Sequence, residues 1–177
     1  MNERKEALEL EVRRDIFDKI SKYPGTYLRE IQSDLDLSIG QVEYHLNYLE
    51  DKGILSNKMV DNKKRYFVDD EVDYPDRKII SILRQKIPRQ ILIKLLNEDK
   101  AGFSDILEDV DISKSTLSFH LKKLTEKGLV DFKKQGRKKI FYCSDENKIA
   151  QVLITYKASF IDKAVDRFVD TWLEMKK

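Results

Sequence analysis

Apolar residues recur every three or four positions in several stretches of this chain, a spacing that predicts amphipathic helices. The first stretch covers residues 4–21 and stops before the helix-breaking pair Pro24-Gly25. A shorter stretch follows at about 26–35. In these two predicted helices the core-facing positions are Leu8, Val12, Ile16, Ile20, Leu28, Ile31 and Leu35.

The third predicted helix, at about 39–52, has a recognisable signal at each end. Ser38 and Gln41 have the spacing of a capping box, in which each side chain bonds to the other residue's backbone N–H. Gly53 suits the left-handed residue that ends many helices. Apolar segments then flank the polar sequence VDNKK (60–64), which predicts a β-hairpin with a basic tip.

This order of elements occurs twice in the chain. Residues 16–71 and 91–146 align without a gap, and roughly sixteen of the aligned pairs are identical. A repeat of this length is one small folded unit used twice. The elements predicted in the second copy are helices at about 89–97, 103–109 and 114–127, and a hairpin with its turn at Gln135-Gly136-Arg137.

Two further helices are predicted outside the repeat. Residues 76–87 have helical periodicity. Pro88 fits the first turn of the following helix and predicts a bend at Ile87. Residues 147–177 carry a long apolar stripe, which predicts one C-terminal helix of roughly 45 Å. This helix either packs back on the chain or pairs with a second copy, and we favour a homodimer. The dimerisation residues that we predict are Tyr156, Phe160, Phe168 and Trp172.

The order helix, helix, tight turn, capped helix, glycine and basic hairpin is that of a winged helix-turn-helix domain. The segment SKSTLSFHLKKLTEKGLV (113–130), followed by KKQGRKKIFY (133–142), resembles the DNA-reading part of ArsR-like archaeal transcription regulators. Residues 38–55 are a weaker version, and the whole chain resembles archaeal tandem winged-helix regulators. The resemblance implies a sequence-specific transcription regulator that binds double-stranded DNA. Its recognition helices 39–52 and 114–127 would lie in major grooves, with the wings on the backbone or in the minor groove.

The predicted fold is therefore mainly α, with two small β-hairpin wings. A first winged domain with the N-terminal helix covers residues 1–75, and a second with the linker helix covers 76–146. The amphipathic C-terminal helix covers 147–177.

Composition restricts where such a protein works. The single cysteine, Cys143, excludes a disulfide within the chain and favours a reducing compartment. No apolar run approaches the roughly 20 residues that span a bilayer. The first residues are too highly charged for a signal peptide. We therefore expect a cytoplasmic protein with no membrane partner.

A recognition helix hides one face in its own core and offers the other to the major groove. Small hydroxyl residues can approach base edges there, and lysines can meet phosphates. In the second copy the predicted DNA contacts are Lys114, Ser115, Thr116, Ser118, Phe119, His120, Lys122, Lys123, Arg137, Lys138 and Lys139. In the first copy they are Gln41, Tyr44, His45, Asn47, Lys63, Lys64 and Arg65.

Some of these residues have an equally plausible structural role. His45 and His120 either contact DNA or pack against a neighbouring helix. Tyr44 and Phe119 lie off the main apolar stripe, so they either stack on the nucleic acid or are partly buried against the wing.

Charge separates the two copies. The net charge of the whole chain is only +2. Residues 113–142 carry nine basic and two acidic side chains, whereas residues 38–67 carry five basic and four acidic ones. Because DNA affinity grows with the number of phosphates neutralised, we predict that the second copy binds more strongly. Glu43 is unfavourable near phosphate unless it accepts a hydrogen bond from a cytosine amine.

Nothing in the sequence indicates catalysis. It contains no Gly-rich phosphate loop, no nucleophile motif and no cluster of metal-ligating residues. We therefore predict no enzyme activity, no cofactor and no metal. Two alternatives to a DNA-binding regulator stay open: a winged-helix adaptor within the transcription machinery, and a regulator that senses a ligand.

Overall fold

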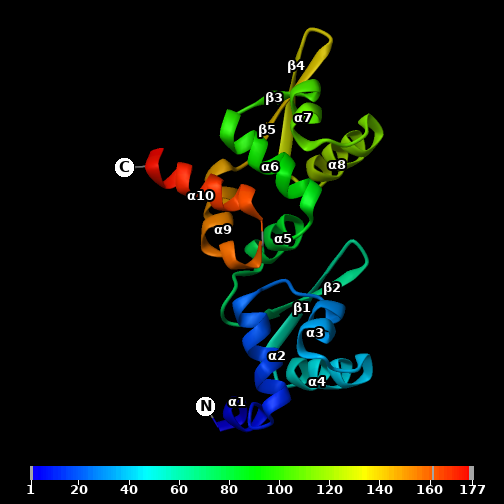
Figure 1. Cartoon of the computed structure of the whole chain (residues 1–177), viewed down its shortest axis with the longest axis vertical. Coiled ribbons are helices and arrows are strands. Elements are labelled where there is room, and N and C mark those ends of the chain that lie inside the picture. Colours follow the sequence, from blue (N-terminus) through cyan, green and yellow to red (C-terminus); the bar gives the residue numbers. More distant parts are fainter. Residues whose placement is uncertain (1, 161, 176–177) are drawn as a thin grey trace. The chain divides into compact units, whose positions relative to one another are not determined.

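The computed structural model describes residues 2–160 and 162–175 of the chain (Figure 1). The chain divides into two compact units, Met1–Ser81 and Ile82–Lys177. The boundary lies inside a helix, whereas we expected it between residues 75 and 76. The reason is Arg77, which bonds to the carbonyl oxygens of Val72 and Asp69 and so holds the start of this helix on the first unit.

The first unit is a small winged helix-turn-helix domain. Its core packs Ile16 and Ile20 against Ile31, Leu46 and Leu49, all fully buried. The predicted helix 4–21 is in fact two helices, because Leu10 takes an extended backbone conformation just before the second one. The elements are α1 (Asn2–Ala7), α2 (Glu11–Lys22), α3 (Leu28–Leu35), α4 (Ile39–Asp51), β1 (Leu55–Val60), β2 (Lys63–Val68) and α5 (Tyr74–Leu83).

The second unit repeats this order and adds C-terminal helices. Its core includes Ile91, Leu92 and Leu95 with Leu117 and Val152. The elements are α6 (Lys86–Glu98), β3 (Ala101–Gly102), α7 (Phe103–Val110), α8 (Lys114–Glu126), β4 (Val130–Gln135), β5 (Lys138–Cys143), α9 (Glu146–Thr155), a short 3₁₀ turn (Lys157–Ser159) and α10 (Lys163–Met175).

The two recognition helices begin as predicted. The Ser38 hydroxyl accepts a hydrogen bond from the Gln41 amide, and the Gln41 side chain accepts one from the Ser38 amide. The Ser113 hydroxyl accepts the Thr116 amide in the same way. Both helices end before a glycine with positive φ, +64° at Gly53 and +70° at Gly128, which confirms the predicted stops.

The wings are two-residue hairpins. In the first, Val60 pairs with Lys63, and the turn residues Asp61 and Asn62 both have positive φ. Such a turn matches the right-handed twist of paired strands. In the second, the strand continues through Gln135, so only Gly136 and Arg137 form the turn.

A third strand was not predicted from the sequence. In the second unit β3 pairs with β5, and in the first unit the only trace of it among the described residues is an isolated bridge between Thr26 and Tyr66. Two residues of β3 are too few to show a periodic pattern, and their pairing is with a segment distant in sequence.

The linker also differs from its prediction. The break between α5 and α6 lies at residues 84–85 and not at Ile87, which is already helical. Pro88 falls in the first turn of α6, as predicted, where its missing N–H costs nothing. The Arg89 guanidinium donates to the carbonyl oxygen of Leu83 and so satisfies the last turn of α5.

The long C-terminal helix is a correction. The segment forms two helices, α9 and α10, and turns back between them so that α10 contacts both α6 and α9. Phe160 and Phe168 are buried inside this unit, so packing replaces the dimerisation role that we expected of them. Tyr156 and Trp172 are half-buried, and for these two residues dimerisation stays a prediction.

Candidate nucleic-acid interface

Helix α8 has the two faces required of a recognition helix. Leu117, Leu121 and Leu124 are buried. The opposite face exposes Lys114, Ser115, Ser118, Phe119 and Lys122. Because positions three and four apart share a helix face, Ser115, Phe119 and Lys122 form one continuous stripe.

The hydroxyl groups at the start of α8 are engaged with each other. The Ser113 oxygen lies 2.7 Å from the Thr116 hydroxyl and 2.9 Å from the Ser115 hydroxyl. Thr116 is therefore part of the helix cap and is half-buried. Ser118 lies outside this cluster and is exposed.

The lysines of α8 differ in their exposure and in the groups that they contact. The Lys122 ammonium lies 3.8 Å from the Glu126 carboxylate, but both side chains are largely exposed, so the pair contributes little stability. Lys123 is half-buried, with its ammonium 5.5 Å from the centre of the Phe119 ring. Lys122 is thus more exposed than Lys123.

The second wing carries basic residues at its tip. Arg137 is in the turn, and Lys138 and Lys139 follow on β5, all exposed. Lys139 lies over the Phe132 ring, 4.0 Å from its centre, which holds the lysine stem along the strand.

A groove separates α8 from this wing. Its volume is about 370 Å³. The lining residues come from α7, α8, β4 and β5: Phe103, Ser118, Leu121, Lys122, Thr125, Glu126, Phe132, Lys139 and Phe141.

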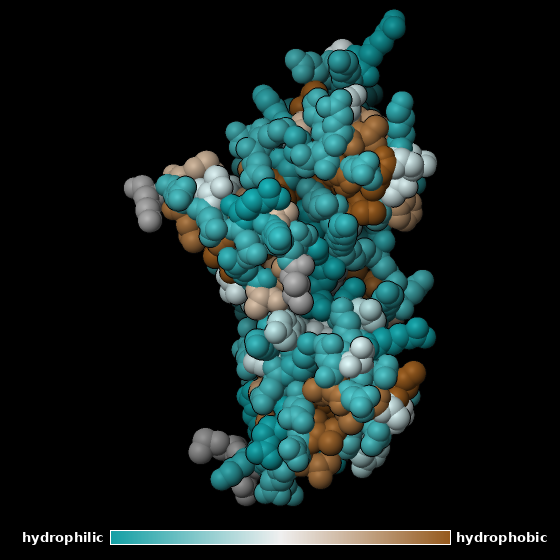
Figure 2. Space-filling view, in the orientation of Figure 1, coloured by the Kyte–Doolittle hydropathy of each residue, from teal (hydrophilic) through white to brown (hydrophobic). Residues whose placement is uncertain are grey.

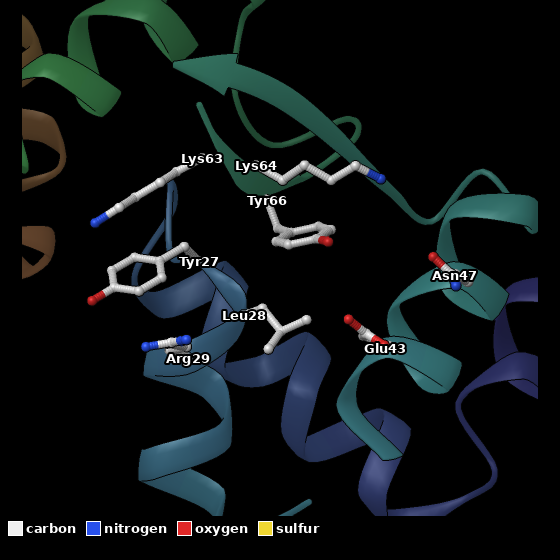
Figure 3. Close-up of a pocket in the computed structure, with 8 residues that line it drawn as sticks. All are labelled: Tyr27, Leu28, Arg29, Glu43, Asn47, Lys63, Lys64 and Tyr66. Atoms are coloured by element: carbon white, nitrogen blue, oxygen red, sulfur yellow. The ribbon is translucent and has the colours of Figure 1, made fainter. Parts of the chain in front are cut away.

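The first unit has a groove at the corresponding place, of about 530 Å³. Figure 3 shows Lys63, Lys64 and Tyr66 on β2 facing Leu28 of α3 and two polar residues of α4, Glu43 and Asn47. Five residues that line this groove align, in the sequence repeat, with five residues that line the groove of the second unit. The pairs are Leu28 with Phe103, Glu43 with Ser118, Asn47 with Lys122, Lys64 with Lys139 and Tyr66 with Phe141.

Tyr27, Arg29 and Tyr66, which also line this groove, were not among the predicted site residues. The sequence indicates their positions in part, because each lies next to an apolar residue of a predicted element. Their convergence, however, depends on β2 folding over α3.

Two predicted contacts of the first unit are corrected. His45 is buried, only 8% exposed, and its ring packs edge-on against Tyr44. Burial, helped by the charge of Arg13, lowers the pKa of His45 and keeps the ring neutral. Arg65 is 6% exposed, and its guanidinium donates to the carbonyl oxygen of Gly25. Neither side chain is placed to reach DNA.

The remaining predicted contacts of the first unit are at the surface. Gln41, Tyr44 and Asn47 lie on the exposed face of α4, and Lys63 and Lys64 on the wing. In the second unit His120 is half-buried beside Phe119, with the ring centres 5.3 Å apart. Its packing matches that of His45 beside Tyr44.

Residues 2–160 and 162–175 contain no helix long and apolar enough to cross a membrane. Nor does this part of the chain bring three His, Cys, Asp or Glu side chains together in a way that could hold a metal ion.

Comparison with known families matches the two units separately. Residues 10–80 match the family HTH_HVO_0163_N, described as an N-terminal HTH domain. Residues 89–131 match the family described as bacterial regulatory protein, arsR family.

Among curated proteins, the chain is similar to an uncharacterised HTH-type transcriptional regulator, MJ1398, of Methanocaldococcus jannaschii. The two are 28% identical over 135 residues, which are 76% of this chain and 34% of the relative. The chain thus spans about a third of the length of this relative.

Two solved structures are similar to about half of the chain. HlyU from Vibrio cholerae is 21% identical, with a TM-score of 0.41, over 47% of this chain and 90% of its own. A possible transcriptional regulator for arsenical resistance is 27% identical, with a TM-score of 0.38, over 52% of this chain and 94% of its own.

Proposed function

We propose that this chain, a tandem helix-turn-helix regulator whose second domain is ArsR-like, binds double-stranded DNA through its second unit and thereby regulates transcription. In this proposal α8 enters the major groove and the wing tip contacts the backbone or the minor groove. Lys122 and Arg137 contact phosphates, while Ser118 and Phe119 approach base edges.

The observation that carries the proposal is the charge of one continuous surface. Residues 113–142 have a net charge of +7, and most of the basic side chains are exposed on α8 or on the wing. Each phosphate that such a surface neutralises adds about −0.9 to the slope of log affinity against log salt concentration. The groove between α8 and the wing is lined by Ser118, Lys122 and Lys139, so helix and wing present their polar groups side by side.

The first unit supports DNA binding less well. We predicted that α4 also lies in a major groove, yet residues 38–67 have a net charge of only +1, and Arg65 and His45 are buried. Gln41, Tyr44 and Asn47 remain accessible on α4.

The test begins with selection of bound fragments from random duplex DNA, which yields a site. Affinity for that site is then measured against salt concentration. The double variant Lys122→Glu, Arg137→Glu should lower the affinity at least about a hundredfold at physiological salt and flatten the salt slope by roughly two. The matched double variant Lys163→Glu, Arg167→Glu changes the net charge equally on the exposed side of α10 and should have little effect.

Two results would refute the proposal. One is a failure to enrich any duplex sequence. The other is equal loss of affinity in both double variants, because binding would then follow the total charge of the chain and not the surface of α8.

A further inference from the structure

The groove of the first unit contains a hydroxyl group on a buried side chain, that of Tyr66. This residue is only 4% exposed, and its hydroxyl forms no hydrogen bond within residues 2–160 and 162–175. Figure 3 shows the hydroxyl directed into the hollow, toward α4. The second unit has Phe141 at this position of the repeat, so the packing of the fold requires the ring but not the oxygen. Because an unpaired buried hydroxyl lowers stability, this one is available to bond to a ligand.

The hydroxyl group of Tyr66 is a hydrogen-bond donor at neutral pH. Burial, together with the charges of Glu50 and Glu43, raises the pKa of Tyr66 to about 12. The proton therefore stays on the oxygen, and the group can donate to a ligand as well as accept from one.

Positive charge predominates among the residues that line this groove. Arg29 on α3 and Lys64 on β2 form no ion pair within the described part of the chain. The Lys63 ammonium lies 4.9 Å from the centre of the Tyr27 ring. Among the described residues that line the groove, Glu43 is the single carboxylate. Three cations against one carboxylate favour an anionic occupant.

The opposite charges lie at different ends of the groove. Figure 3 shows Arg29 and Lys63 at one end of the hollow and Glu43 with Asn47 at the other, and Tyr66 lies between them. A carboxylate accepts hydrogen bonds from N–H groups, and an amide side chain both donates and accepts. An occupant that fits both ends therefore carries an anionic group at one end and N–H donors at the other.

The groove also has the size and the apolar lining of a small-molecule site. Its volume of about 530 Å³ lies within the usual range of ligand pockets, which combine apolar walls with a few polar groups. Leu28 and the rings of Tyr27 and Tyr66 supply the apolar contacts. Figure 2 shows apolar surface gathered where α3 and α4 lie, the two helices that flank the groove, with hydrophilic side chains around it. An organic molecule thus fits this groove better than a simple inorganic ion does.

We propose that this groove binds a small organic anion that also carries N–H donors, the chemistry shared by amino acids and nucleoside monophosphates. The carboxylate or phosphate group of the ligand pairs with Arg29 and Lys63. Its N–H groups donate to Glu43, and the Tyr66 hydroxyl forms a further hydrogen bond. One copy of the fold then binds a ligand, while the other copy binds DNA according to the proposed function.

The test uses the full chain and isothermal titration calorimetry, with the standard amino acids and the nucleoside monophosphates as probes. At least one probe should bind with a Kd below about 1 mM. The amide of that amino acid, or the nucleoside of that nucleotide, lacks the anionic group and should bind about tenfold more weakly. The two sets of probes show whether the anionic group is a carboxylate or a phosphate.

Variants of the groove locate the binding site. Tyr66→Phe introduces the residue of the second unit and should weaken binding about fivefold. It should not lower the Tm of the free chain, because the hydroxyl has no partner to lose within the described residues. Arg29→Ala and Glu43→Gln should each weaken binding about tenfold. Arg14→Ala, the matched change at an exposed position of α2, should have no effect.

Three outcomes would overturn the inference. No probe binds, a bound probe is indifferent to all three groove variants, or Tyr66→Phe lowers the Tm and so reveals a partner of the hydroxyl within the chain.

Duplex DNA provides an independent measurement, because phosphates of DNA are also anions. Arg29→Ala should leave the affinity for the selected duplex within about twofold. If this variant lowers that affinity about tenfold, the groove holds a DNA phosphate and the inference fails while the proposed function stands. The calorimetric titration needs no DNA, so failure of the proposed function would leave the ligand site to be judged by its own variants.

Discussion

Arg89 and Asp162 form an ion pair that ties the beginning of α6 to the beginning of α10. Two nitrogens of the guanidinium, Nε and Nη2, lie 3.0 and 2.7 Å from the same carboxylate oxygen, and both side chains are largely buried. The other oxygen of Asp162 accepts the Ala164 amide at 2.9 Å and so starts α10. One carboxylate thus sets both where the C-terminal segment turns and what it packs against.

The first prediction concerns this ion pair. Arg89→Ala should lower the free energy of unfolding of the second unit by about 3 kcal/mol, because a carboxylate is left buried without its partner. Asp166→Ala, a change on α10, removes the exposed partner of Lys157 in the 3₁₀ turn and should cost less than about 1 kcal/mol. Urea denaturation of the three proteins measures both values. Equal costs would contradict the structural role given to Arg89.

The same pair predicts a dependence on pH. Burial by itself raises the pKa of Asp162, but the Ala164 amide and the Arg89 guanidinium outweigh it, so the pKa is lowered on folding. A lowered pKa contributes stability above the ordinary value of the carboxyl group, and this contribution is lost as the pH falls through the folded value. The stability gap between the natural chain and Asp162→Asn should therefore be present at neutral pH and shrink as the pH falls below the ordinary pKa of an aspartate carboxyl. A gap that does not depend on pH would exclude this mechanism.

The second prediction uses the two helix caps. Ser113→Ala removes the acceptor of the Thr116 amide, and Ser38→Ala removes that of the Gln41 amide. Each should cost about 1 kcal/mol of stability. Only Ser113→Ala should also weaken DNA binding, because it frays the helix that we place in the major groove. Thermal unfolding and a binding titration separate the two effects, and a loss of DNA affinity in both variants would assign both helices to DNA.

The third prediction concerns a homodimer through the end of α10. Leu173 is exposed there, beside the half-buried Trp172, and offers apolar surface without being part of the core. Leu173→Asp should halve the mass measured by light scattering. Thr171→Asp adds the same charge about 160° away around the helix and should leave the dimer intact. A natural chain that is monomeric, or a Leu173→Asp variant that stays dimeric, rules out this interface.

The fourth prediction concerns the single thiol. Burial, with a smaller effect of Glu146, raises the pKa of Cys143 to about 12. Because the thiolate is the reactive form, the folded protein should react with a thiol reagent at about pH 8 far more slowly than the unfolded chain does. Reaction rates with and without guanidinium chloride measure the difference. Similar rates would show that Cys143 is not held in the core.

Much of the fold could be predicted because its signals are local. The starts of α4 and α8 follow from a serine and the backbone three residues later, and their ends follow from Gly53 and Gly128. The winged helix-turn-helix architecture and the exposed face of α8 follow from the same short-range patterns. The apolar stripe of the C-terminal segment was also recognised, but its spacing says only that the stripe is buried and not by what.

The candidate site was predicted less completely. The sequence correctly indicated that Lys122, Phe119 and Arg137 are exposed. The sequence did not show that Arg65 is buried whereas its neighbour on the strand, Lys64, is exposed. Alternation along a strand predicts that they face opposite sides, but not which side is covered.

The sequence by itself determined the repeat, which is a direct match between residues 16–71 and 91–146, and the unequal charge of its two recognition helices. It also determined the positions of the repeated helices and wings, since their signals lie within a few residues of one another. The tertiary structure decided which side chains are buried and which groups they contact. Arg65 is buried and donates to the carbonyl oxygen of Gly25, 40 positions away. Helix α10 turns back because Asp162 pairs with Arg89, 73 positions before it. Such contacts depend on how the whole chain folds, so no local pattern of apolar and polar residues can specify them.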